Sequence, residues 1–139
     1  MGETNTENTY IDYNKDYPIL SYQETKENFK RQVEYELLVK DGWDLDEVDE
    51  LVEIAVDVLL SSAETIRVNR EEKPAELVKR QYGRLTMLHM QYVLNSLRET
   101  ETKAHNIRAV MITALYNAAN TIGSYYGNLY RYHGKTGVG

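Results

Sequence analysis

The side chains best suited to chemistry in this sequence are tyrosines, of which it has 12 against one Phe and one Trp. Several gather in the C-terminal part of the chain, beside basic residues. Tyrosine and arginine are favoured at protein interfaces because each combines a large contact area with a polar tip, and aromatic rings beside cations can also stack on unpaired bases. The pattern indicates binding rather than catalysis. The predicted partner-binding residues are Tyr116, Asn117, Tyr125, Tyr126, Tyr130 and Arg131.

A structural interpretation of the same tyrosines stays open. In a helical bundle, tyrosine rings pack at the margin of the core with the hydroxyl in water. Tyr116 and Tyr125 fit that interpretation as well as they fit a partner surface.

The ingredients of common active sites are missing from the sequence. His89, His105 and His133 are too scattered to suggest a metal site, and none belongs to a helical HExxH pair. There is no cysteine, which excludes disulfides, thiolate metal sites and a cysteine nucleophile. No phosphate-binding glycine loop or GxSxG elbow is present. We therefore expect a chain that is not an enzyme and that binds no metal or cofactor.

The charge is distributed unevenly along the chain. Residues 1–101 carry 12 basic and 22 acidic side chains, a balance of −10, whereas residues 102–139 carry four basic and no acidic side chains, a balance of +4. The net charge of −6 argues against indiscriminate nucleic-acid binding. The basic part is either a short tail without a partner or a surface for an anionic one.

Length and hydropathy predict one cytoplasmic domain. A chain of 139 residues with 42% apolar content can bury one core but not two ordinary ones. No apolar run approaches the roughly 20 residues that cross a bilayer, and the first residues lack the features of a signal peptide. We expect no membrane association.

The elements that must position the candidate side chains are helices. Residues 1–20 show no sustained helical period, and we expect a flexible arm or linker there. Ser21 and Glu24 form a capping box, which predicts a first helix from Ser21 to about Lys40, ending before a left-handed Gly42. Its predicted apolar stripe comprises Phe29, Val33 and Leu37.

A second predicted helix follows, capped by Asp44 or Asp46. Its apolar and acidic residues fall on opposite faces. We interpret the acidic face as solvated and, as the alternative, as a surface for a partner. The apolar face comprises Leu45, Val48, Leu51, Val52, Ala55, Val58 and Leu59, and the acidic face Asp46, Asp49, Glu50, Glu53 and Asp57.

Alternating residues 65–69, followed by the polar run 70–73, predict a short strand or a hairpin arm. Pro74 is expected at the first position of a helix that ends at Gly83. Its predicted apolar contacts are Leu77, Val78 and Tyr82.

Two more helices are predicted in the C-terminal half. Thr86 caps the first, and Asn106 opens the second, whose 3.6-residue apolar period makes it the predicted central helix. The helical domain is expected over 21–133, with a disordered tail at 134–139. The fold class is therefore all-α, a compact bundle of five or six helices with a short hairpin arm. The inner faces comprise Met87, Met90, Val93, Leu94 and Leu97, then Ile107, Val110, Met111, Ala114, Leu115 and Ala118.

From about Tyr17 to Arg131 the chain resembles the C-terminal domain of RepA-type replication initiators of Gram-positive plasmids and conjugative elements. Six stretches carry the resemblance: YPI at 17–19, LVEIAVDVL at 51–59, TIRVN at 65–69, PAELVKRQYGRL at 74–85, HMQYVLNSL at 89–97 and IRAVMITALYNAANTIGSYY at 107–126.

The resemblance implies a DnaD-like fold and a role in DNA replication. In that family an N-terminal winged-helix domain recognises the origin, and the C-terminal domain is thought to recruit host replication proteins. The sequence has no winged-helix segment before residue 1, so we expect a detached C-terminal module. DnaD-like domains carry a YxxxIG motif, whereas five residues separate Tyr116 from Ile122 here.

The expected function is therefore protein interaction, with host primase or helicase loader as the partner. Two alternatives stay open. The basic, tyrosine-rich C-terminal segment would bind single-stranded DNA weakly. Self-assembly is the other, in which the acidic second helix of one copy meets the basic tail of another.

Overall fold

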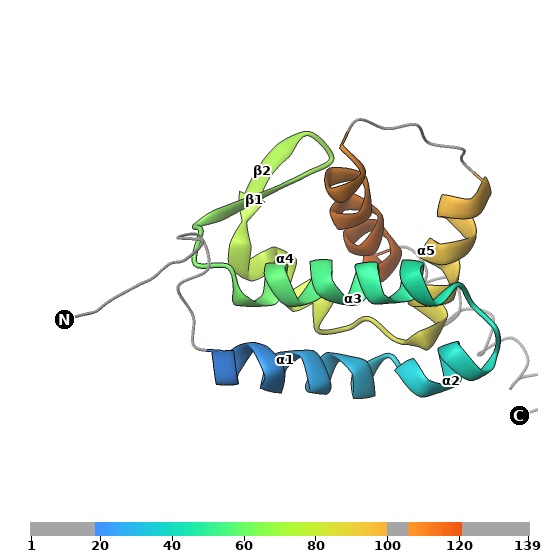
Figure 1. Ribbon diagram of the computed structural model, residues 1–139. Helices are drawn as coiled ribbons and strands as arrows, with labels where there is room; N and C mark the ends of the chain where they lie inside the picture. The colour runs from blue at the N-terminus through green and yellow to red at the C-terminus, as the bar shows by residue number, and fades with distance from the viewer. Residues whose placement is uncertain (1–18, 100–105, 121–139) are drawn as a thin grey trace, which may run out of the picture.

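The computed structural model describes residues 19–99 and 106–120. In this part of the chain it is a helical bundle with one two-stranded antiparallel hairpin, which confirms the predicted all-α class with a hairpin arm. Figure 1 shows α1 and α2 end to end along one side, α3 beside them, and the helix over 107–120 on the far side of α3, near the hairpin. Among the described residues no helix has the length and apolar character needed to cross a membrane.

The predicted first helix is interrupted. It forms α1 (Ile19–Gln32) and α2 (Tyr35–Lys40), separated by Val33 and Glu34, and the backbone of Glu34 is left-handed with φ 55°. The left-handed residue rotates the chain out of the 3.6-residue phase, so Leu38 is fully buried while Leu37 is 43% exposed. The prediction that Leu37 belongs to the core stripe was therefore wrong, although Phe29 and Val33 are buried as expected.

The N-terminal boundaries also differ slightly from the prediction. Because α1 already includes Ile19, Ser21 lies inside the helix and is not its cap. Ile19 and Leu20 are helical rather than part of the expected arm. The rest of that arm and the expected tail over 134–139 lie outside the described residues. Gly42 is left-handed, with φ 93°, as predicted.

The helix over 107–120, which we predict to be central, buries Leu115 and Ala118 in the core. The helix α3 (Leu45–Leu60) packs against α1, α2, α4 and α5. Asp44 caps it, with its carboxylate accepting a hydrogen bond from the Glu47 N–H at 3.2 Å. Ile54 and Val56, outside the predicted stripe, are buried too, whereas Leu45 is 47% exposed.

The acidic face of α3 is only partly solvated, which corrects the expectation. Asp46 and Glu50 are exposed. The other three acids join α3 to neighbouring helices. Tyr35 Oη donates to Asp49 at 2.5 Å, Lys26 Nζ to Glu53 at 2.6 Å, and Arg108 Nη2 to Asp57 at 3.0 Å. Hydrophobic burial on one side and ionic contacts on the other therefore hold this helix.

The hairpin consists of β1 (Thr65–Val68) and β2 (Glu71–Pro74), paired in the register Val68 with Glu71. Val68 is buried and anchors the hairpin to the core. Helix α4 (Ala75–Tyr82) follows directly, so Pro74 is its N-cap and the last strand residue rather than its first helical residue. Gly83 ends α4 as predicted.

Two helices complete the described core. They are α5 (Met87–Glu99) and the helix over 107–120, which Asn106 caps by accepting from the Ala109 N–H at 3.1 Å. Tyr82 is fully buried, and its hydroxyl donates to the Ile112 carbonyl at 2.7 Å. Gln32 Nε2 donates to the carbonyls of Tyr82 and Leu85, at 3.0 and 2.8 Å. These contacts connect α1, α4 and the helix over 107–120.

Candidate functional site

A groove separates the hairpin tip from one face of the helix over 107–120. Its volume is about 640 Å³, within the range of typical ligand pockets. The helical wall is formed by residues spaced so that they share one face. The hairpin contributes polar and basic side chains. The lining residues are Arg67, Asn69, Arg70, Ala109, Val110, Thr113, Ala114 and Asn117.

The hairpin tip forms the outer edge of this groove and is a two-residue turn. Asn69 and Arg70 connect the paired residues Val68 and Glu71, and both have positive φ, 53° and 66°. Two positive φ values are characteristic of the type I′ turn, which matches the right-handed twist of a hairpin. Asn and Gly are the favoured residues of this turn, so Asn69 fits its position while Arg70 occupies a glycine position.

Hydrogen bonds hold the tip against the helix. The Asn69 N–H donates to Thr113 Oγ1 at 3.2 Å. The side-chain amides of Asn69 and Asn117 bond to each other reciprocally, at 3.0 and 3.1 Å. Since each amide uses both its donor and its acceptor, the pair fixes the distance between turn and helix, and with it the width of the groove.

The charges of the hairpin leave one cation without a counter-ion. Arg67 pairs with Glu72 at 3.1 Å, and Lys73 pairs with Glu71 at 3.2 Å. Thr65 and Arg67 also lower the pKa of the exposed Glu72 carboxyl, through hydrogen bonds to it. Among the described residues, Arg70 has no hydrogen bond or ion pair, and it lies at the groove edge.

The predicted partner-binding residues fall into three groups: one is buried, one lines the groove, and four lie outside the described residues. Tyr116 is only 6% exposed, so it packs in the core, in line with the structural interpretation of the tyrosines. Asn117 is exposed and lines the groove. Tyr125, Tyr126, Tyr130 and Arg131 lie outside the described residues.

Sequence reasoning missed the two arginines of the groove. Arg67 belongs to the alternating stretch 65–69 and Arg70 to the polar run 70–73, but no local pattern places either beside residues more than 40 positions away. One signal was available. Arg70 follows Asn69 in a two-residue turn where Asn-Gly would be the strongest hairpin sequence.

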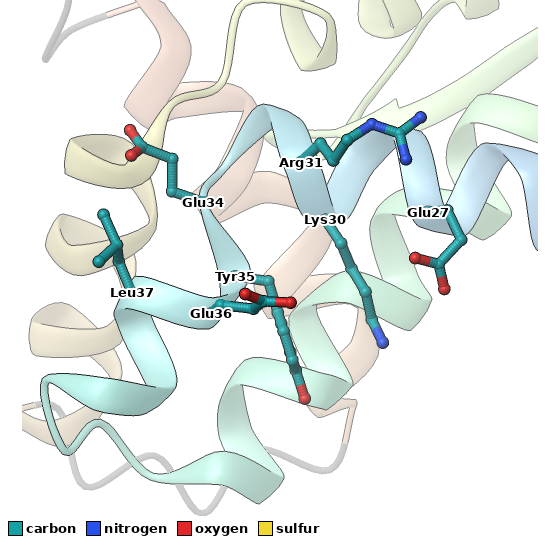
Figure 2. Close-up of a pocket in the computed structure, with 7 residues that line it drawn as sticks. All are labelled: Glu27, Lys30, Arg31, Glu34, Tyr35, Glu36 and Leu37. Carbon is teal, nitrogen blue, oxygen red and sulfur yellow. The ribbon is translucent and has the colours of Figure 1, made fainter.

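A second hollow, of about 410 Å³, lies where α1 meets α2. Five of its seven lining residues are charged, but the side chains do not converge. Figure 2 shows Glu34 and Leu37 directed to one side, and Lys30 and Tyr35 to another. The lining residues are Glu27, Lys30, Arg31, Glu34, Tyr35, Glu36 and Leu37.

Two polar side chains of this hollow, Tyr35 and Lys30, are engaged in contacts. Tyr35 Oη donates to Asp49 at 2.5 Å, and this hydrogen bond, with burial, raises the pKa of Tyr35 to about 12. Lys30 Nζ lies 4.4 Å from the centre of the Tyr35 ring, a cation–π contact. The hollow is therefore a consequence of the break between α1 and α2, with its tyrosine held in place by α3.

The histidine that the structure describes has a structural position. His89 is buried, and its Nδ1 accepts from the Thr86 N–H at 2.8 Å near the start of α5. Burial and nearby Arg84 lower the pKa of His89. Over 19–99 and 106–120, no cluster of three or more His, Cys, Asp or Glu side chains is arranged to hold a metal ion.

The groove is thus the described site most suited to binding. It combines a small apolar wall, two arginines and a turn that is hydrogen-bonded to the helix. No curated protein and no solved structure matches the chain. The resemblance to replication initiators therefore stays a prediction. A protein-family model does match residues 14–137, and the chain therefore belongs to DUF6017, a family of unknown function.

Proposed function

We propose that this chain is a protein-interaction module of a plasmid or mobile-element replication initiator, which recruits host primase or helicase loader in the cytoplasm. The sequence resemblance supports the setting. The observation that carries the binding role is the groove between hairpin and helix, where an apolar wall of Ala109, Val110 and Ala114 faces two arginines. Arginine beside apolar surface is the composition found at the energetic centre of protein interfaces.

The architecture also suits binding. The groove wall and the hairpin tip are joined by the Asn69 and Asn117 amides, so the surface is already ordered before a partner arrives. A preformed surface loses less conformational entropy on association, which raises affinity without additional contacts.

The test uses purified primase and helicase loader from a Gram-positive host, with the whole chain immobilised on a biosensor. We expect one of them to bind, and Ala109→Arg to weaken that binding by about 10-fold because the long side chain fills the groove. Ala109 is exposed and arginine is a good helix former, so the fold should be unaffected. Gln23→Arg, at an exposed position of α1, is the matched control.

A combined Tyr125→Ala, Tyr126→Ala and Arg131→Ala variant separates the two candidate surfaces. Loss of binding in this variant alone would place the contact in the C-terminal segment rather than the groove. Failure of both host proteins to bind the parent chain would contradict the recruitment proposal.

Single-stranded DNA binding is the second candidate function, favoured by the cations Arg67 and Arg70 at one edge of the groove. Base stacking requires aromatic rings, and none of the groove-lining residues is aromatic. DNA binding here would rest on phosphate contacts and would fall steeply with added salt. Fluorescence anisotropy with labelled oligo(dT) at low and physiological salt measures it directly.

A further inference from the structure

We propose that the groove between the hairpin and the helix over 107–120 binds an acidic, amphipathic segment of a partner protein, and that Arg70 is the residue that contacts its carboxylate. This inference rests on the proposed interaction function, and specifies the chemistry of the partner and the residue that recognises it.

The first argument comes from the backbone of Arg70. Its φ of 66° lies in the left-handed region, which costs an L-residue with a Cβ atom free energy that glycine does not lose. Glycine is also the favoured residue at this position of a two-residue hairpin turn. Asparagine tolerates the conformation at position 69, but arginine has no such tendency. A strained residue kept in place of the favoured one points to a use for its side chain.

The second argument comes from charge. Each carboxylate of the hairpin already has a cation, Glu72 with Arg67 and Glu71 with Lys73. Arg70 is left over, and it has no partner among the residues that the structure describes. A guanidinium binds a carboxylate through two parallel hydrogen bonds, so an acidic side chain is its natural counterpart.

The third argument comes from the groove wall. Ala109, Val110 and Ala114 are small and apolar, which lets a partner backbone or an aliphatic side chain approach closely. The amides of Asn69 and Asn117 satisfy each other and need no hydrogen bonds from the occupant. The matching ligand therefore has apolar residues facing the helix and a carboxylate facing the turn.

For Arg70→Gly we expect higher thermal stability together with weaker partner binding. The substitution relieves the left-handed strain, so the melting temperature should rise by about 2 °C. The same substitution should weaken partner binding by about 10-fold, because the carboxylate loses its cation. Arg70→Lys keeps the strain and the charge but not the two-pronged geometry, and should give intermediate binding without a rise in melting temperature.

The probes are the purified primase and helicase loader, together with two synthetic peptides. One peptide is an amphipathic helix with leucines spaced three and four residues apart on one face and glutamates on the other, and the second peptide carries lysine in place of each glutamate. We expect the acidic peptide to bind more tightly than the basic one, and to lose this preference in Arg70→Gly. Arg80→Ala, which removes an exposed α4 arginine that does not line the groove, is the charge-matched control.

The outcomes separate this inference from the proposed function. If a host protein binds parent and Arg70→Gly equally, the inference is overturned while recruitment stands. If neither host protein binds but the acidic peptide binds through Arg70, the inference is supported, and primase and helicase loader are excluded as the partners. Absence of any preference for the acidic peptide, or Arg70-dependent binding of oligo(dT) instead, would overturn the inference.

Discussion

Two surface hollows in the described part of the chain contain non-glycine residues with left-handed backbone, yet they differ in what surrounds the strained residue. At the junction of α1 and α2, Glu34 is left-handed and the neighbouring Tyr35 is held by Asp49 and Lys30. At the hairpin tip, Arg70 is left-handed and has no partner among the described residues. Backbone strain alone does not indicate function. The proposal for Arg70 therefore rests on its strained backbone together with its unpaired side chain and the apolar groove wall beside it.

The largest expected effect tests the structural interpretation of the junction. Leu38→Ala removes a fully buried side chain and should lower the free energy of unfolding by about 2–4 kcal/mol. Leu37→Ala, next to it but 43% exposed, should change it by less than about 0.5 kcal/mol. Urea denaturation of both variants measures the difference. Equal losses would mean that the left-handed Glu34 does not set which leucine enters the core.

A medium effect is expected at the groove. Asn69→Ala removes the amide pair with Asn117 and places alanine at positive φ, so we expect a loss of about 1 kcal/mol. Asn117→Ala breaks the same pair without the backbone strain and should cost less. A double-mutant cycle, followed by urea denaturation, gives the coupling energy of the two amides. Additive losses would show that they do not hold the tip.

The junction should also respond to alkaline pH. Because the hydrogen bond to Asp49 and burial raise the pKa of Tyr35 to about 12, the unfolded chain releases this proton at lower pH than the folded chain does. The stabilisation is complete below the ordinary tyrosine pKa of about 10 and is lost as pH rises towards about 12. Tyr35→Phe should show a shallower loss of stability over that range in urea denaturation. An unchanged dependence of stability on pH would show that Tyr35 does not cause the alkaline loss of stability.

The smallest effect on the free energy of unfolding is expected at Glu34. Glu34→Gly relieves left-handed strain and should raise the free energy of unfolding by about 0.5 kcal/mol, as for Arg70→Gly. Partner affinity should be unchanged in Glu34→Gly, unlike in Arg70→Gly. Thermal melts paired with biosensor titrations of both variants test this. If Glu34→Gly also weakens binding, the junction participates in recognition and the contrast between the two hollows disappears.

Local sequence signals predicted most of the described secondary structure. The Asp44 cap, the left-handed Gly42, the hairpin, the end of α4 at Gly83 and the cap at Asn106 each depend on a few adjacent residues. The errors arose where a distant contact decided the outcome. The sequence pattern assigned the acids of α3 to solvent, but Lys26 and Arg108 approach Glu53 and Asp57 from other helices.

The candidate site was harder to predict than the fold. Asn117 was predicted to bind a partner because it lies at the basic end of the charge gradient; it lines the groove, and its binding role stays a prediction. Tyr116 has the same chemistry as an interface tyrosine, but its position on the helix directs its side chain into the core. Arg67 and Arg70 were treated as polar hairpin residues because nothing in their local sequence indicates what lies opposite.

The sequence by itself determined the helical class, the hairpin and the absence of cysteine chemistry, because periodicity, capping residues and composition act over short distances along the chain. Only the tertiary structure decided that Leu38 rather than Leu37 enters the core, that α3 is surrounded by other helices, and that the turn at Arg70 faces the helix over 107–120. Those outcomes depend on packing and hydrogen bonds between residues far apart in the chain, such as Asn69 and Asn117. No local pattern encodes such pairs.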